Sequence, residues 1–449
     1  MSNNITSLSL VETIEALERK EFSEEDLNSA YLERISTLNE KLGIFLEVKK
    51  NTSGIPAGIK DVIITKDIKT TAGSKILSNF IPQYNATVVE RLLTQNISII
   101  GKTNCDEFAM GSSGENSSFG VTKNPWDLSK VPGGSSSGSA AAVSADLCVF
   151  ALGTDTGGSI RQPASLCGVV GLKPSYGRVS RYGLIAMASS LDQPGSFTKT
   201  VADSRKVLEW ISGGDTYDSN AKESKFIPST TLKNLKGIRV GVPQEYFEEG
   251  LDKGVEKVIR EAINKLEELG AEIVEVSLPH TEYAIATYYI IIASEVSTNL
   301  ARFDAIRFGN SRDNFGSEPK RRIMLGTYAL SSGYYDAYFS KAAKVRTLIK
   351  QDFEKAFEKC DVIVGPVSPT TAWNLGEKIS DPLTMYLSDA YTIPASLAGI
   401  PGLSIPCGFS EGLPVGLQIL GKYMDDETVL GVGEVYEQAT NWRKEKPKL

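Results

Sequence analysis

"GTDTGGSIRQPAS", residues 153–165, puts glycines, hydroxyls, one Asp and one Arg between two apolar stretches. "LCVFALG" (147–153) precedes it and has the pattern of a buried strand, and "LCGVVGLKPS" (166–175) follows it. Buried backbone N–H and C=O groups need hydrogen-bond partners, so a polar segment inside the core must have a defined structure. The pattern predicts a strand that ends in a structured polar loop rather than in a linker.

Short apolar runs alternate with helical patterns on both sides of this loop. "VVERLL" leads into the strand-like "ISII" (97–100), and "SGSAAAVSADL" leads into "CVFALG". Such alternation predicts an α/β protein with a twisted, mixed or largely parallel sheet and helices on both faces. A helix is expected around 255–266, where apolar residues recur at helical spacing. Further buried strands are expected at 237–243, 271–279, 361–367 and 402–408.

The chain is expected to be one large domain over residues 1–449, without repeats. "SLVE" (9–12) and "SEED" (23–26) are capping-box signatures that start two amphipathic helices before residue 42. The polar segment 213–231 is interpreted as a surface excursion between an N-terminal and a C-terminal half. This gives N-terminal helices at 1–50, a catalytic core at 55–200 and a half that completes the sheet and the substrate pocket at 235–449.

Composition excludes several classes of protein. With 41% hydrophobic and 23% charged residues the chain is typical of globular proteins, and no apolar run approaches the roughly 20 residues that span a bilayer. No secretory signal is visible, so a cytoplasmic location without membrane contact is expected. A net charge of −7 argues against nucleic-acid binding through the protein's own field. Five scattered cysteines without a CxxC pair indicate buried thiols rather than a metal or disulfide framework.

One histidine, His280, is present in the whole chain. Its sequence neighbours include neither a partner carboxylate nor a nucleophile motif, so Ser-His-Asp hydrolysis and His-rich zinc catalysis are both disfavoured. A hydrolase with this sequence needs another base.

Two glycine-serine loops, 131–143 and 153–160, are candidates for the site. Neither contains the lysine of a phosphate-binding P-loop. The first, taken alone, is equally well interpreted as a glycine-rich turn with solvated serines. In the second, Thr156, Gly157 and Gly158 offer successive backbone N–H groups that can converge on an oxyanion beside the Ser159 hydroxyl.

A serine nucleophile needs a proton acceptor, and Lys60 in "SGIPAGIKDVI" is the candidate. Burial among apolar residues lowers the pKa of a lysine, so that its neutral form can act as a base. The alternative is a surface lysine whose stem lies along apolar neighbours.

"GGSSSGSAAAV" followed by "GTDTGGSIRQPAS" resembles the amidase signature family, whose members use a Ser–cis-Ser–Lys triad. Other stretches extend the resemblance over essentially the whole chain and are similar to the glutamine-hydrolysing A subunits of tRNA-dependent amidotransferases, a branch of that family. These stretches are "GIPAGIKDVI", "NCDEFAMGSSGENSSFG", "GLKPSYGRVSRYGL", "SSGYYDAY" and "LAGIPGLSIPCG". The resemblance implies the amidase signature fold.

The resemblance also implies a mechanism. Ser159 would attack the side-chain amide of glutamine, and Ser135, on a cis peptide, would bridge it to Lys60. Lys60 would accept the proton of the nucleophile through Ser135 and return it to the departing ammonia. The backbone N–H groups of Thr156, Gly157, Gly158 and Ser159 would form the oxyanion hole.

Residues around the triad receive roles as well. Asp155 and Arg161 are expected to fix the backbone of the loop through hydrogen bonds or an ion pair. By resemblance, the glutamine α-carboxylate is bound by an arginine in "KRRIMLGTYAL", where Arg322 is favoured over Arg321, and the α-ammonium by Asp389. Tyr288 or Tyr289 would line the same pocket. The segment 309–319 is shorter than the resemblance leads us to expect.

No cofactor or metal is expected in this chain. The resemblance implies a heterotrimer with the B and C subunits of the amidotransferase, in which the B subunit uses ATP and Mg²⁺ and receives ammonia through a tunnel. The misacylated tRNA would be held mainly by the B subunit, which agrees with the acidic balance of this chain. The amidated product would be Gln-tRNA(Gln) alone or Asn-tRNA(Asn) as well.

Two other interpretations stay open at this point. A free-standing amidase of the same family would share the triad and act on small or peptide amides. A catalytically silent scaffold protein would need neither a base nor two aligned hydroxyls, so the presence of Lys60, Ser135 and Ser159 argues against it.

Overall fold

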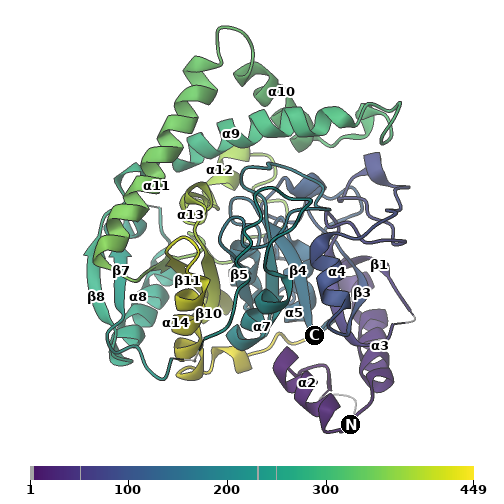
Figure 1. The fold of residues 1–449 in the computed structure, drawn as a ribbon, viewed down its shortest axis with the longest axis vertical. Helices are drawn as coiled ribbons and strands as arrows, with labels where there is room; N and C mark the ends of the chain where they lie inside the picture. Colours follow the sequence, from purple (N-terminus) through teal and green to yellow (C-terminus); the bar gives the residue numbers. More distant parts are fainter. Residues whose placement is uncertain (1–4, 51, 230–231, 249) are drawn as a thin grey trace.

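Eleven strands form one mixed sheet in the order β1-β3-β2-β4-β6-β5-β10-β11-β9-β7-β8 (Figure 1). The computed structural model describes residues 5–50, 52–229, 232–248 and 250–449. The strands are β1 (Phe45–Val48), β2 (Ile55–Lys60), β3 (Ile97–Thr103), β4 (Phe150–Asp155), β5 (Val170–Lys173), β6 (Gln193–Thr198), β7 (Arg239–Pro243), β8 (Glu272–Val276), β9 (Val362–Pro366), β10 (Gly402–Ser410) and β11 (Leu413–Gly421).

Parallel pairing is confined to two places in the sheet. β2 pairs in parallel with β3 and β4, and β7 pairs in parallel with β8 and β9. The strands between these groups pair antiparallel, including β5 with β10, where the two halves of the sequence meet. The expected mixed sheet is therefore confirmed, and one continuous sheet joins both halves.

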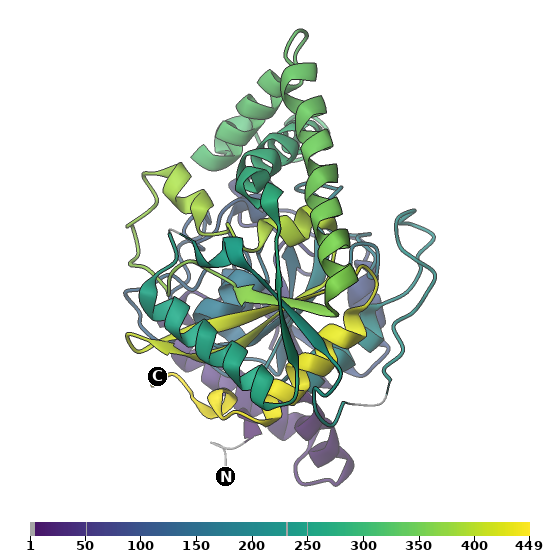
Figure 2. The same ribbon diagram turned by 90° about the vertical axis from the view of Figure 1, so that its left-hand side faces the viewer.

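Helices pack on both faces of the sheet (Figures 1 and 2). α2 and α3 begin directly after Ser9 and Ser23, whose side chains complete the two predicted capping boxes. The helices are α2 (Leu10–Glu18), α3 (Glu24–Leu42), α4 (Thr87–Leu93), α5 (Ser137–Ser144), α6 (Arg161–Cys167), α7 (Val201–Ile211), α8 (Lys253–Glu268), α9 (Ala284–Asn299), α10 (Ser317–Ala329), α11 (Lys341–Lys359), α12 (Pro382–Leu387), α13 (Ile393–Ala398) and α14 (Asp426–Gln438).

The expectation of a buried strand at 271–279 is wrong in one respect. The strand exists as β8, but most of its residues are exposed or half-buried, and Val276 alone is buried. β8 is the last strand of the sheet and has a neighbour on one side only. The apolar residues of β8 therefore belong to a partly covered edge strand and not to a central strand of the sheet.

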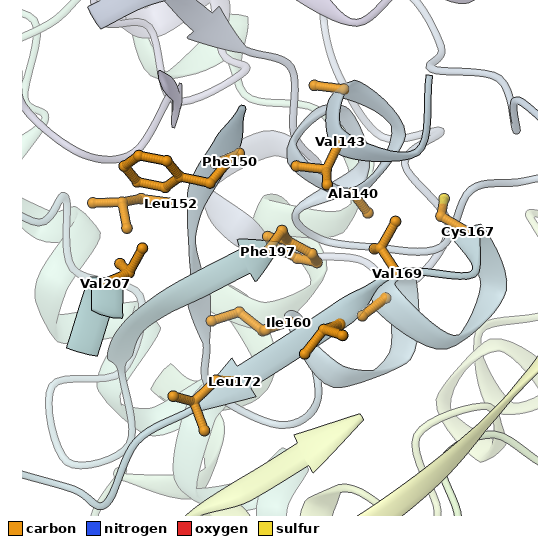
Figure 3. Close-up of a cluster of buried hydrophobic side chains, with 14 of the residues drawn as sticks. Ala140, Val143, Phe150, Leu152, Ile160, Cys167, Val169, Leu172, Phe197 and Val207 are labelled. Carbon is orange, nitrogen blue, oxygen red and sulfur yellow. The ribbon is translucent and has the colours of Figure 1, made fainter. Parts of the chain in front are cut away.

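The core beneath the two glycine-serine loops is built from several elements (Figure 3). Phe197 of β6 lies among side chains from the neighbouring elements, and Ile160 lies beside it. The side chains around them come from α5, β4, β5 and α7, and all are buried: Ala140, Val143, Phe150, Leu152, Leu172 and Val207. This packing fixes the ends of β4 and α6, between which residues 156–160 run.

Two helices, α9 and α10, lie against each other, and with α11 they extend beyond one end of the sheet (Figures 1 and 2). Gly326 of α10 allows the close approach, because a Cβ there would lie 1.8 Å from the carbonyl oxygen of Ala293 on α9. α9 and α10 carry the tyrosines and arginines singled out by the sequence.

The polar segment 213–231 contains no helix or strand in its described part, 213–229, and residues 230 and 231 lie outside the described residues. Asp215 and Asp218 tie it to the body of the protein by accepting hydrogen bonds from Ser180 and Arg181. Within the described ranges, no helix is long and apolar enough to cross a bilayer.

Candidate active site

Lys60 is the last residue of β2, and its side chain is completely buried. Its Nζ donates to the Ser135 hydroxyl at 2.7 Å and to the Thr154 hydroxyl at 2.8 Å. Burial lowers the pKa of Lys60 to about 8, although Asp106 and other buried carboxylates oppose that shift. A lysine with this pKa supplies neutral amine near physiological pH. The complete burial of the side chain excludes the alternative of a surface lysine.

Ser135 lies just before α5, and the peptide bond between Gly134 and Ser135 is cis. The backbone N–H of Asp106 donates to the Ser135 carbonyl at 3.2 Å. A Cβ on Gly134 would lie 2.2 Å from the Asp106 carboxylate and 2.8 Å from the backbone nitrogen of Ser113. This position therefore has no room for a side chain.

Ser159 follows β4 at the end of the loop and is partly exposed, whereas its neighbours from Gly153 to Gly158 are buried. Its hydroxyl makes no hydrogen bond with any described residue, including Ser135. Among the same residues, no acceptor bonds the backbone N–H groups of Gly157, Gly158 or Ser159. A free hydroxyl beside free N–H donors can attack a carbonyl and stabilise the oxyanion that forms. The Thr156 hydroxyl donates to Asp192 at 2.7 Å.

Asp155 and Arg161 form a buried ion pair that closes the loop between β4 and α6. Arg161 donates from Nε and Nη2 to the two oxygens of Asp155, each at 3.0 Å. Asp155 also accepts the backbone N–H of Ile160 at 3.2 Å. Arg161 further reaches the carbonyl of Thr392 and the side chain of Gln418, so the loop is tied to the C-terminal half of the chain.

The loop borders on two of the residues expected to bind substrate. A Cβ on Gly157 would lie 2.5 Å from the Tyr288 hydroxyl, and one on Gly158 would lie 3.3 Å from Oδ1 of Asp389. Asp389 is buried; Ser112 donates to its Oδ2, but Oδ1 has no hydrogen-bond partner among the described residues. Burial raises the pKa of Asp389 to about 7. An unpaired carboxylate oxygen beside Gly158 is a ready acceptor for a cationic group.

Arg322 is buried, and its guanidinium lies over the ring of Tyr289, 5.2 Å from the centroid. Its Nε donates to Glu318 at 2.7 Å, and the described residues provide no acceptor for its two terminal nitrogens. Arg321 is half-exposed and pairs with the other oxygen of Glu318. The structure therefore places Arg322 rather than Arg321 among the aromatic residues of α9 and α12, and Tyr289 also stacks on Tyr386.

Several polar residues at the site were not expected from the sequence. Thr154 accepts a hydrogen bond from Lys60, as Ser135 does, and Gln162 accepts one from Gly134. Both residues lie within 153–165, but a threonine or a glutamine by itself does not indicate a contact with the site. Ser112 donates to Asp389 and Thr392 donates to the carbonyl of Gly157, each from a segment distant in sequence, and the residue types alone do not signal these contacts.

His280 lies outside this constellation. His280 has a carboxylate partner, Asp352 of α11, which accepts its backbone N–H and contacts Nδ1 at 2.9 Å. Asp352 is distant in sequence, so the residues next to His280 do not indicate it. No described hydroxyl or thiol is hydrogen-bonded to its ring. All five cysteines are buried and free, as expected. In the described part of the chain, no group of three or more His, Cys, Asp or Glu residues is arranged to hold a metal ion.

The sequence model of the amidase family matches residues 15–430. The chain belongs to the amidase family. This amidase is 54% identical over 473 aligned positions to the A subunit of glutamyl-tRNA(Gln) amidotransferase from Thermoanaerobacter pseudethanolicus, with 97% of each chain covered. It is 60% identical over 423 positions to the A subunit of the same name from Thermodesulfovibrio yellowstonii, covering 90% of this chain and 87% of that one.

The fold agrees with that of a solved relative. The crystal structure of the A subunit of glutamyl-tRNA(Gln) amidotransferase from Thermotoga maritima matches this amidase with a TM-score of 0.84 and 45% sequence identity. The match covers 98% of this chain and 94% of that one. The expected amidase fold is confirmed.

Proposed function

We propose that this chain is the glutamine-hydrolysing subunit of a tRNA-dependent amidotransferase. The observation that carries the proposal is the buried hydrogen bond from Lys60 to Ser135, next to a loop with a free Ser159 hydroxyl and free backbone N–H groups. The high identity to amidotransferase A subunits over nearly the full chain supports the choice of glutamine and tRNA.

In the acylation step, Ser159 Oγ attacks the side-chain carbonyl carbon of glutamine. The Ser159 proton passes to Ser135, and the Ser135 proton passes to neutral Lys60. The N–H groups of Gly157, Gly158 and Ser159, with that of Thr156, stabilise the oxyanion while negative charge develops on the former carbonyl oxygen.

Collapse of the oxyanion breaks the carbon–nitrogen bond and expels ammonia. The proton held by Lys60 returns through Ser135 to the leaving nitrogen, so the amine is released as NH₃ and Lys60 is neutral again. Water then hydrolyses the γ-glutamyl ester on Ser159, with the same base, and gives glutamate. The sequence of steps is acyl transfer through a covalent intermediate.

Substrate binding uses the two charged residues beside the loop. Asp389 accepts the glutamine α-ammonium through its unpaired oxygen, and Arg322 donates to the α-carboxylate through its free terminal nitrogens. Tyr288, next to Gly157, and Tyr289, beneath the Arg322 guanidinium, are assigned to the wall of the same substrate site. Asp155 and Arg161 hold the loop in shape and take no part in bond making.

Ammonia is useful only if a partner consumes it before it is lost to solvent. We propose that the B and C subunits of the amidotransferase complete a cytoplasmic heterotrimer, and that the B subunit binds ATP, Mg²⁺ and the misacylated tRNA. Those groups belong to the partner, and this chain supplies the ammonia.

Ammonia release from glutamine tests the proposal. It is measured with the chain alone and then with the B and C subunits, ATP and Glu-tRNA(Gln). A low rate that rises with the partners, and that Ser159→Ala abolishes, is expected. Indifference to the partners together with faster turnover of a simpler amide would instead indicate a free-standing amidase. Asp-tRNA(Asn) in place of Glu-tRNA(Gln) tests the second acceptor.

A further inference from the structure

Gln162 contacts three separate parts of the site, although its side chain is completely buried and is hydrogen-bonded neither to a triad hydroxyl nor to Lys60. Its Oε1 accepts the backbone N–H of Gly134 at 3.0 Å, one peptide before the cis bond to Ser135. Its Nε2 donates to the carbonyl of Ser112 at 2.8 Å. Its own backbone N–H donates to the carbonyl of Gly158 at 2.8 Å, next to Ser159.

These contacts form an unbroken chain from Asp389 to the bridging serine. Ser112 donates its hydroxyl to Oδ2 of Asp389 and presents its carbonyl to Gln162. Gln162 continues the chain to Gly134, and Ser135 is hydrogen-bonded to Lys60. Every side chain in this series is buried, so water does not compete for these hydrogen bonds.

Neighbouring glycines indicate that this arrangement is tight. A Cβ on Gly133 would lie 2.4 Å from Oε1 of Gln162 and 2.8 Å from the Cα of Pro163. Oε1 of Gln162 is therefore packed directly against Gly133, so a movement of Ser112 that shifts the Gln162 amide is transmitted to the backbone at Gly133 and Gly134.

We propose that Gln162 is a positioning residue that, together with Ser112, makes the alignment of Ser135 depend on occupation of Asp389 by the substrate ammonium. A cation bound to Oδ1 of Asp389 fixes that carboxylate, the carboxylate fixes Ser112, and Gln162 passes the constraint to Gly134, the residue that precedes the cis bond to Ser135. An amide without an α-ammonium leaves Asp389 unoccupied, and it is cleaved slowly even when bound. The inference rests on the proposed function, because it takes glutamine as the substrate.

The test compares two substrates that share the same γ-amide. Glutamine carries the α-ammonium, and glutaramate is the same molecule with hydrogen in its place. The holoenzyme with the B and C subunits is used, and kcat and KM are measured for both substrates. In Gln162→Leu we expect kcat for glutamine to fall about tenfold or more, while kcat for glutaramate changes by less than about threefold.

Gln193→Leu is the matched control. Gln193 is also buried, and its amide likewise accepts one backbone N–H, from Gly177 at 3.0 Å, and donates to one carbonyl, that of Val179 at 3.1 Å. Its loss destabilises the fold in a similar way, so we expect the kcat ratio of glutamine to glutaramate to stay at the wild-type value. Equal losses for both substrates in Gln162→Leu would overturn the proposal.

Ser112→Ala keeps the test decisive if Gln162→Leu does not fold. It removes one hydroxyl next to Asp389 and retains Gln162, and it is expected to lower the kcat ratio in the same direction. An unchanged ratio in Ser112→Ala would overturn the coupling. If the wild-type complex releases no ammonia from glutamine, the proposed function itself fails, which is a different result.

Discussion

Asp389 keeps one carboxylate oxygen unpaired in the protein interior, and this should lower stability at neutral pH. Burial raises the pKa of Asp389 to about 7, whereas an unfolded aspartate titrates near 3.9. The folded state thus holds this proton more tightly than the unfolded state. Asp389 therefore costs no stability below about pH 4, where it is protonated in both states. The free energy of unfolding falls as the pH rises from there through about 7, where the folded carboxyl loses its proton.

Asp389→Asn should therefore stabilise the protein relative to wild type as the pH rises. We expect the difference in free energy of unfolding to shift in favour of the variant by about 2–3 kcal/mol between pH 5 and pH 8. Denaturant unfolding at both pH values measures it, and glutamine hydrolysis should be lost in the same variant. Asp336→Asn, which removes an exposed carboxylate, is the control variant. If the difference in free energy of unfolding between Asp389→Asn and wild type were the same at pH 5 and pH 8, the raised pKa of Asp389 would be contradicted.

The pKa of Lys60 should determine the pH dependence of the chemical step. Its pKa of about 8 means that the charged form, which cannot accept a proton, predominates below that pH. Because kcat reports the enzyme–substrate complex, we expect it to fall about tenfold for each pH unit below about 7. Steady-state ammonia release from pH 6 to pH 9 measures the profile.

Lys173→Met provides the comparison for that profile. Lys173 is another buried lysine, and burial lowers its pKa to about 7, but its Nζ donates to the carbonyl of Pro174 rather than to a site residue. The profile should keep its midpoint in this variant. A profile that is flat between pH 6 and pH 8 in the wild-type enzyme would rule out Lys60 as the base.

At the scale of elements, the contact between α9 and α10 should control glutamine affinity. Gly326→Ala would place a Cβ 1.8 Å from the Ala293 carbonyl oxygen, a backbone atom that cannot rotate away. α10 must then move from α9, and Arg322 moves away from Tyr289. We expect KM for glutamine to rise about tenfold, kcat to change less, and stability to fall by about 1–3 kcal/mol.

Thr327→Ala separates this effect from a general change in α10. Thr327 is the exposed neighbour of Gly326, and its hydroxyl bonds a carbonyl of its own helix. Steady-state kinetics should give a wild-type KM for this variant. A wild-type KM in Gly326→Ala would mean that the α9–α10 contact does not position Arg322.

Elements with local signals were predictable from the sequence, and elements defined by their neighbours were not. α2 and α3 begin at the predicted serines because a capping box lies within four residues. The exposure of β8 depends on its place at the end of the sheet, which no local pattern records. β2 was not expected at 55–60, because Pro56 and Gly58 weaken the strand pattern.

At the scale of the whole molecule, the two halves of the chain should not fold separately. A fragment of residues 1–229 would leave β5 without its partner β10. It would also leave the buried Arg161 without its acceptors at Thr392 and Gln418. The ion pair with Asp155 lies within the fragment, but the buried Nη1 donors of Arg161 would be left without acceptors, which is destabilising. We expect the fragment to aggregate or remain unfolded when it is expressed alone.

Co-expression with residues 232–449 should restore a soluble complex that releases ammonia from glutamine. Size-exclusion chromatography and the ammonia assay check this. An intact chain cut between residues 229 and 232 after folding serves as the control and should remain assembled. A monomeric 1–229 fragment with a cooperative unfolding transition would contradict the prediction.

The candidate site, like the helices and strands, was predictable only where a local sequence pattern marks it. The glycines of 156–158 and the apolar surroundings of Lys60 indicated an oxyanion loop and a buried base, and the resemblance added the remaining residues. Gln162 and Ser112 act through backbone groups of other segments, at distances that only the folded chain creates. Their hydrogen bonds leave no trace in spacing or composition.

The buried cysteines have a practical consequence. All five are free, and burial raises the pKa of each thiol, so the thiolate that reacts with alkylating reagents is both rare and inaccessible in the folded protein. Cys105, Cys148 and Cys167 lie in the N-terminal half, and Cys360 and Cys407 lie in the C-terminal half. Pulsed maleimide labelling followed by mass spectrometry would therefore record when each half opens, without any engineered probe. An added surface cysteine could carry a fluorophore while the native five remain in place.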